Sequence, residues 1–121
     1  MEPNFLVESS VADDGLSATG IVVFDPGYPA IMSRGGRVNQ AECLHAAWNI
    51  ARIMAPKLGW TKLRAGDTRI ISCHEAVAGR QYQIQASAEK RMLGFGKFEA
   101  VIKDKDGKQT IYKVETVFFA E

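Results

Sequence analysis

One long helix is predicted between Val38 and Lys57, and it is apolar on most of its sides. Such a helix has to be covered on several faces, so it constrains the fold of the whole chain. Asn39 is placed to cap its start, with Glu42 three residues later in the capping-box position. Pro56 and Gly59 mark its end.

This predicted helix carries Asn39, Glu42 and Asn49 along a single line. At roughly 100° per residue, these three positions fall within one narrow arc of the helix. A buried carboxylate and two buried amides cost free energy unless they have partners. The stripe of polar residues is therefore either solvated or faces a site.

Alternating apolar and polar residues predict strands on both sides of this helix. Two strands come before it and four after it: Phe5–Val11, Leu16–Phe24, Thr68–His74, Gln81–Leu93, Phe98–Lys103 and Ile111–Phe119. The turn signals at residues 13–15 and 104–108 predict that neighbouring strands form antiparallel hairpins.

Three segments are predicted to lack regular structure. The two prolines and the glycine of Asp25–Pro29 cannot continue a central strand, and the loop that follows is expected to reach Gly36. Trp60–Asp67 is expected to connect the helix to the next strand. Gly94–Gly96 is expected to interrupt the strand region.

Size and charge exclude several classes of protein. A chain of 121 residues indicates one domain, over residues 1–121. The net charge of +1 argues against nucleic-acid binding, and no run of about 18 apolar residues predicts a membrane span. The acidic N-terminus lacks a signal-peptide pattern. Cys43 and Cys73 are expected to be free, mostly buried thiols in a cytoplasmic protein.

The order of two strands, a long helix and four antiparallel strands resembles the hotdog fold. In that fold an antiparallel sheet wraps one long central helix, and two subunits usually join their sheets edge to edge. The resemblance implies an α+β protein that forms a homodimer or a homotetramer.

The segment Pro29–Glu42 resembles the helix entrance of the FcoT-like long-chain fatty acyl-CoA thioesterases, one family of hotdog proteins. The residues that match in register are Gly36, Arg37, Val38, Asn39 and Glu42. That family has a second Asn about two and a half helical turns further on, and Asn49 lies one residue beyond it. The family's active-site tyrosine would fall at Ile31, so Tyr28 is the candidate to replace it.

A second resemblance is to the hydroxyacyl-carrier-protein dehydratases. Phe24–Pro29 contains their Pro-Gly-x-Pro core, and Glu42 is a candidate for their helical acid. Dehydration needs a base for the α-proton and an acid for the departing hydroxyl, and Phe24 occupies the place of the catalytic histidine. Dehydration is therefore the second hypothesis.

The preferred hypothesis is hydrolysis of an acyl-CoA or acyl-carrier-protein thioester, in fatty acid or polyketide-type metabolism. Glu42 would activate water as a general base, while Asn39 and Asn49 position the water and the carbonyl. Free amides between Val38 and Ala41 would hold the oxyanion. The structural alternatives are a capping box for Asn39 and Glu42 and a hydrogen-bonded core amide for Asn49.

The residues beside the helix entrance suggest how a substrate would be held. Gly35 and Gly36 would let a ligand approach the backbone closely, or they form a simple turn. Arg34 and Arg37 would meet the phosphates of a CoA or phosphopantetheine arm, or they are solvated. Lys90 and Arg91 share this ambiguity. His45 lies near Glu42 on the predicted helix, so it would either join the site or pack in the core or an interface.

Other chemistry finds little support in the sequence. No spacing of His, Cys, Asp or Glu predicts a metal site, no cofactor is implied, and Cys43 has no adjacent base that would make it a nucleophile. A non-catalytic acyl-binding protein is the third hypothesis.

Overall fold

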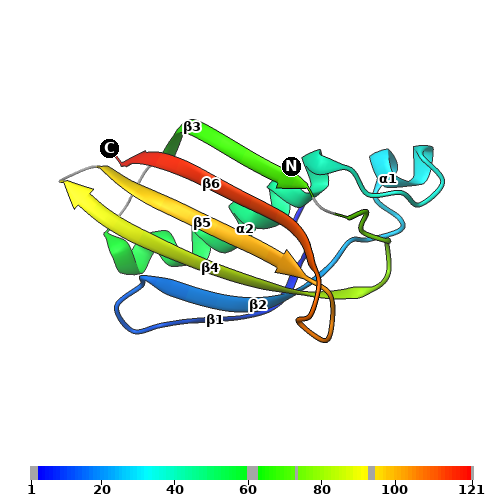
Figure 1. The fold of residues 1–121 in the computed structure, drawn as a ribbon, viewed down its shortest axis with the longest axis horizontal. Helices are drawn as coiled ribbons and strands as arrows, with labels where there is room; N and C mark the ends of the chain where they lie inside the picture. Colours follow the sequence, from blue (N-terminus) through cyan, green and yellow to red (C-terminus); the bar gives the residue numbers. More distant parts are fainter. Residues whose placement is uncertain (1–2, 60–62, 73, 93–94, 121) are drawn as a thin grey trace.

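A computed structural model describes residues 3–59, 63–72, 74–92 and 95–120. It contains one antiparallel sheet with a long helix across one face, as Figure 1 shows. The strands are β1 (Leu6–Val11), β2 (Ser17–Val23), β3 (Leu63–Ser72), β4 (Gln81–Met92), β5 (Phe95–Lys103) and β6 (Thr110–Ala120). The helices are α1 (Pro29–Ser33) and α2 (Gln40–Leu58).

The six described strands lie in the order β1-β2-β4-β5-β6-β3, so β1 and β3 form the edges of the sheet. The turns at residues 13–15 and 104–107 close the predicted hairpins, with the Asp14 and Asp104 side chains accepting backbone N–H bonds. Alternation along the strands sends one set of side chains towards α2, as in β6, where Tyr112, Val114 and Thr116 are all buried.

The core lies between this inner face of the sheet and α2. The side of the helix that faces the sheet is lined with small and medium apolar residues, which let the strands approach closely: Ala46, Ala47, Ile50, Ala51, Met54 and Ala55. Trp48 packs edge-on against Phe118 of β6, with ring centroids 5.4 Å apart. A helix covered in this way by a curved sheet needs few charged groups on its inner side.

Three predicted boundaries were wrong. β5 begins at Phe95, inside the segment predicted to interrupt the strands and three residues before the predicted start, because residues 95–97 pair with both β4 and β6. The segment after Pro29 forms the short helix α1 instead of a loop, because Pro29 suits the first helical position. β3 begins at Leu63, five residues before the predicted start, because residues 63–65 pair with β6 beyond a β-bulge between Ala65 and Thr68. The described helices include none that is both long and apolar enough to cross a membrane.

Candidate functional site

The loop between α1 and α2 is shaped by Gly35 and Gly36. Both have positive φ angles, of 70° and 89°, which glycine adopts without strain. Their N–H groups bond back to the carbonyls of Met32 and Ile31, so the glycine pair ends α1. Apart from each glycine and its two neighbours in the chain, no described atom lies within 4 Å of the place where a β-carbon would be, so the space beside the pair is open.

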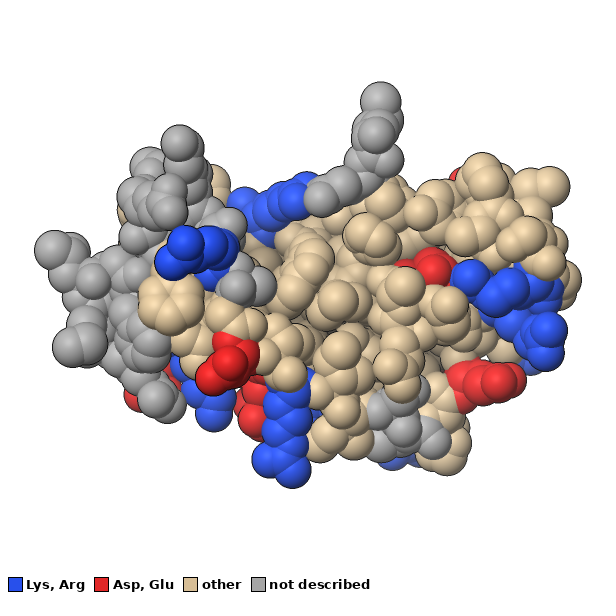
Figure 2. Space-filling view, turned by 90° about the horizontal axis from the view of Figure 1, so that it is seen from above, with Lys and Arg blue, Asp and Glu red and all other residues tan. Residues whose placement is uncertain are grey.

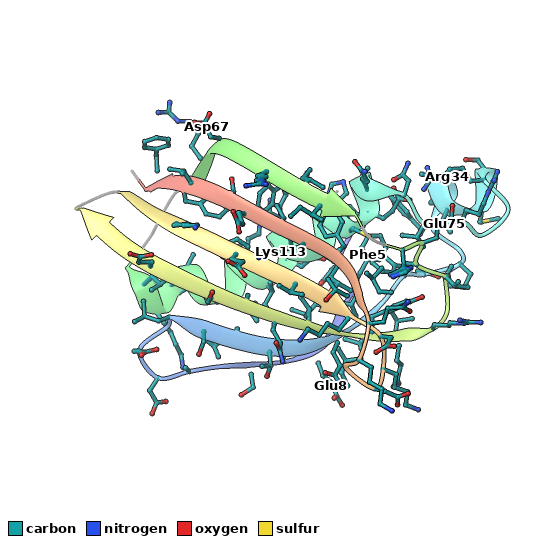
Figure 3. The ribbon with its side chains drawn as sticks, in the orientation of Figure 1. Phe5, Glu8, Arg34, Asp67, Glu75 and Lys113 are labelled. Atoms are coloured by element: carbon teal, nitrogen blue, oxygen red, sulfur yellow. The ribbon has the colours of Figure 1, made fainter. Side chains whose placement is uncertain are left out.

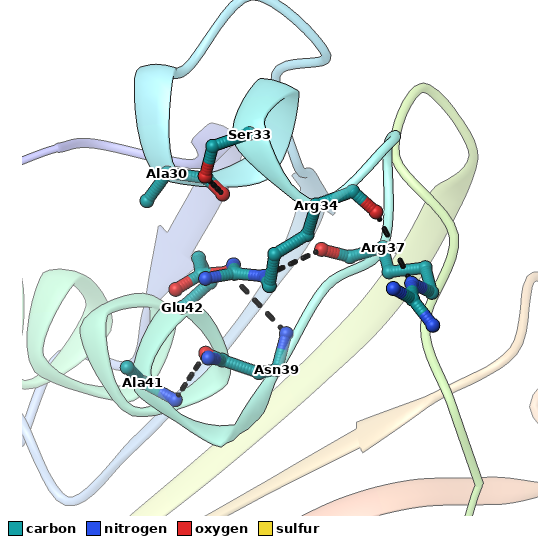
Figure 4. Close-up of polar contacts among 7 residues, drawn as sticks. All are labelled: Ala30, Ser33, Arg34, Arg37, Asn39, Ala41 and Glu42. Carbon is teal, nitrogen blue, oxygen red and sulfur yellow. Dashed lines mark hydrogen bonds and ion pairs between the residues drawn. The ribbon is translucent and has the colours of Figure 1, made fainter.

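Arg34 and Arg37 hold this loop closed from both sides. Arg34 Nε donates to the carbonyl of Arg37, and Arg37 Nε donates to the carbonyl of Arg34, each at 3.1 Å (Figure 4). Arg34 lies at the end of the molecule formed by α1 (Figure 3). The two predicted phosphate-binding arginines therefore lie together and fix the helix entrance.

Glu42 lies in the first turn of α2 and is 3% exposed. Its Oε1 forms an ion pair with the Arg34 guanidinium and accepts the Asn39 N–H at 3.3 Å. The Asn39 side chain in turn accepts the Ala41 N–H at 2.9 Å and the backbone N–H of Glu42, and the latter bond completes the predicted capping box. A guanidinium beside a buried carboxylate stabilises its charged form.

The cap changes the predicted set of oxyanion donors. The N–H groups of Asn39 and Ala41 are both occupied, by Glu42 and by the Asn39 side chain. The N–H of Gln40, the first helical residue, plays no part in this cap. The positive end of the α2 dipole remains at this entrance.

Asn49 has different hydrogen-bond partners from Asn39 and Glu42, the other two residues of the stripe. Its Oδ1 accepts the Phe5 N–H and its Nδ2 donates to the Pro3 carbonyl, each at 3.0 Å. The amide therefore fastens the segment that precedes β1 onto α2. This is the structural alternative that the sequence left open for Asn49.

Tyr28 lies on the same side of the molecule as this N-terminal segment. Its ring meets Phe5 edge-on, with centroids 5.5 Å apart, and its backbone forms the N-cap of α1. Phe24 also packs on Phe5 and is completely buried. The aromatic contacts of Tyr28 thus belong to the core around β1 and β2.

Tyr112 is a residue that sequence reasoning overlooked. It is 1% exposed, and its hydroxyl has no hydrogen-bond partner among the described residues. Burial, and then the nearby Cys43 thiol, raise the pKa of Tyr112 above its ordinary value. The signal in the sequence was a tyrosine at an inward position of an alternating strand, where its polar tip needs a partner.

Cys43 is a free, buried thiol, as predicted. Burial raises the pKa of the Cys43 thiol from 9.0 to about 12, which keeps it protonated and unreactive. Cys73 and the side chains of Lys90 and Arg91 lie outside the described part of the structure. Within the described ranges, no three His, Cys, Asp or Glu residues lie close enough to hold a metal ion.

No protein-family model and no curated protein match this sequence, whereas many solved structures share its fold. A hypothetical thioesterase from Streptococcus pneumoniae, solved with coenzyme A, has 8% identity and a TM-score of 0.76, covering 97% of this chain and 88% of its own. The Escherichia coli PaaI protein, from the phenylacetic acid degradation operon, has 11% identity and a TM-score of 0.75, with coverage of 93% and 81%.

Zebrafish thioesterase superfamily member 2 has 14% identity and a TM-score of 0.75, and the alignment covers 94% of this chain and 80% of that protein. At these identities the similarity establishes the fold. The chain therefore has the predicted hotdog fold, an α+β arrangement of one antiparallel sheet around a long helix.

Proposed function

We propose that this protein hydrolyses an acyl thioester carried by coenzyme A or by an acyl carrier protein. The observation that carries the proposal is the buried carboxylate of Glu42 at the start of a 19-residue helix, beside two glycines that border open space. A carboxylate held in its charged form can take a proton from a water molecule beside it. The positive end of the helix dipole adds stabilisation for a developing oxyanion.

In the proposed reaction, Glu42 takes a proton from a water molecule whose oxygen attacks the thioester carbonyl. The tetrahedral intermediate then breaks its carbon–sulfur bond to give the carboxylic acid, and the departing thiolate takes up the proton that Glu42 had accepted, which restores the carboxylate. Both described contacts of the carboxylate fall on Oε1, which leaves Oε2 as the atom to meet the water. The Gln40 N–H, outside the cap, is the first backbone donor for the oxyanion.

We assign binding of the carrier's phosphates to Arg37. Arg34 is already neutralised by Glu42, whereas the exposed Arg37 uses only its Nε for the loop contact described above. Its terminal nitrogens point away from the ring of contacts in Figure 4. The Streptococcus pneumoniae protein holds coenzyme A in the same fold, which supports a CoA thioester as one form of the substrate.

We further propose that the reaction resembles that of the FcoT-like long-chain thioesterases. This proposal rests on the residues that match that family between Gly36 and Glu42. The burial of Phe24 favours hydrolysis over dehydration. This side chain lies among Phe5 and Tyr82 in the core, so its position supplies neither an acid nor a base. Fatty acid and polyketide-type metabolism remain the two settings proposed for the substrate.

We also propose that two chains join through β3 to form a dimer. β3 is an edge strand, and Ile70 and Ile71 remain 38% and 40% exposed on it. Seen from above, the middle of this side is mostly uncharged (Figure 2). An edge strand with exposed apolar side chains pairs readily with another strand.

The deciding experiment measures thiol release from a panel of acyl-CoA and acyl-carrier thioesters by the wild type and by Glu42→Gln. Glutamine still suits the cap but cannot accept the proton, so kcat should fall about 100-fold or more with little change in affinity for a non-hydrolysable analogue. Glu8→Gln, at an exposed carboxylate on β1, is the matched control and should behave as wild type.

Two results would contradict this proposal in different ways. Near wild-type turnover by Glu42→Gln would reduce Glu42 to a helix cap. A wild type that binds acyl thioesters tightly but hydrolyses none of the panel would favour the non-catalytic acyl-binding hypothesis.

A further inference from the structure

The Tyr112 hydroxyl is a buried polar group without a described partner, in a core whose other polar groups are mostly paired. Tyr82 provides the contrast, because it is also buried on the inner face of the sheet, at 5% exposure. The Tyr82 hydroxyl accepts the Val77 N–H at 2.7 Å, whereas the Tyr112 hydroxyl has no hydrogen-bond partner among the described residues. A buried hydroxyl is costly when unpaired, so an unpaired one points to a partner that binds from outside the chain.

The position of Tyr112 places that partner near the helix entrance. α2 and β6 run in the same direction across the molecule (Figure 1), and the Trp48–Phe118 contact joins them further along. Tyr112 comes six residues before Phe118, towards the start of both elements. Its phenol lies near enough to the Cys43 thiol for the two groups to interact electrostatically, and Cys43 follows Glu42 directly.

The chemistry of a buried phenol selects the kind of partner. A neutral O–H is a single directed donor, which suits a neutral acceptor such as a carbonyl oxygen. A phosphate or a carboxylate would instead be matched by a cation. The nearby Cys43 thiol is only a weak hydrogen-bond donor, and it stays protonated.

We infer that the Tyr112 hydroxyl donates a hydrogen bond to the carbonyl oxygen of the bound thioester, as a second oxyanion donor beside the start of α2. The inference rests on the thioesterase function proposed above. It makes Tyr112 a catalytic residue, because the hydroxyl would touch the reacting carbonyl. A bond that strengthens as charge develops on that oxygen would act mainly on kcat.

The test compares Tyr112→Phe with the matched variant Tyr82→Phe. Each protein is assayed for turnover and for affinity towards two non-hydrolysable analogues, an acyl ketone that keeps the carbonyl and a thioether that lacks it. For Tyr112→Phe we expect kcat to fall about 10- to 100-fold and ketone affinity to fall about 10-fold, with thioether affinity unchanged. Its thermal midpoint should equal or exceed that of the wild type, because no hydrogen bond within the protein is lost.

Tyr82→Phe should show the opposite pattern, because it loses a structural bond to Val77. Its thermal midpoint should fall, while the ratio of ketone to thioether affinity stays that of the wild type. Both variants remove one hydroxyl from a buried tyrosine of the same sheet face, so general effects of the substitution cancel.

The inference is overturned if Tyr112→Phe keeps wild-type turnover and ketone affinity while the wild type hydrolyses thioesters. A lowered thermal midpoint or a failure to fold would also overturn it, by showing that the hydroxyl has a structural partner. A wild type that binds both analogues but hydrolyses nothing refutes the proposed hydrolysis. The ketone-to-thioether comparison still decides whether Tyr112 meets the carbonyl.

Discussion

A single oxygen atom of Glu42 contacts both a backbone amide and an arginine. The hydrogen bond from the Asn39 amide belongs to the helix cap, and the ion pair with Arg34 connects α2 to the loop after α1. The proposed catalytic role needs only the other carboxylate oxygen. One side chain can therefore fix the helix entrance and accept a proton there, which is why a glutamine substitution separates the two roles.

At the residue scale we predict that Asn49→Ala mainly destabilises the protein. Removing the amide leaves the Phe5 N–H and the Pro3 carbonyl without their partner, which should cost about 1–3 kcal/mol of unfolding free energy. Urea unfolding measures this loss, and Asn49→Asp, which keeps an acceptor for Phe5, should lose less. Full stability with a large loss of turnover would instead place Asn49 in the catalytic site, as the helical stripe first suggested.

The contacts of these residues could be predicted only where they are local. The cap between Asn39 and Glu42 spans three positions, so the spacing alone predicted it correctly. The partners of Asn49 lie 44 and 46 residues away along the chain, and helical periodicity carries no information about them. Tyr112 was missed for the same reason, because an unpaired hydroxyl can be recognised only when all its neighbours are known.

At the scale of the element, the start of α2 depends on Asn39. We predict that Asn39→Ala lowers the unfolding free energy by about 1 kcal/mol, because the Ala41 N–H loses its acceptor. Asn39→Asp keeps that acceptor and should retain near wild-type stability. Turnover of the same two variants shows whether Asn39 also contacts the substrate. If Asn39→Asp is stable but inactive, the amide nitrogen of Asn39 touches the substrate, and if it is fully active, Asn39 is only a cap.

Most elements were predictable because their signals lie within them. Alternation along β4 and the turn before β6 were read correctly from a few neighbouring residues. The start of β3 was missed because Leu63 and Arg64 belong to the strand only through pairing with Ala120 and Phe119, on the far end of the chain. Likewise α1 is a single short turn of helix, below the length at which periodicity is visible.

For the whole molecule we predict a dimer that forms through β3. Light scattering at micromolar concentration should give twice the mass of one chain. Replacing Ile70 and Ile71 together by lysine should yield monomers, because charges on the edge prevent strand pairing. Val7→Lys, at an exposed position on the opposite edge strand β1, is the control and should leave the dimer intact. A wild-type monomer would contradict the proposed interface.

The strand order also has a consequence for how the chain folds. β4, β5 and β6 follow one another in sequence and in the sheet, whereas Thr68 of β3 meets Thr116 of β6 across 48 residues. The pairing of β2 with β4 also joins distant residues, such as Val23 with Gln81. Closing such long loops costs more entropy than closing a hairpin, so β3 and the β1–β2 hairpin should both join after β4, β5 and β6 have paired. In pulse-labelling hydrogen exchange during refolding, amides of β4 and β5 should become protected before those of β3. The strand proposed to join two subunits would then be completed late in the folding of each of them.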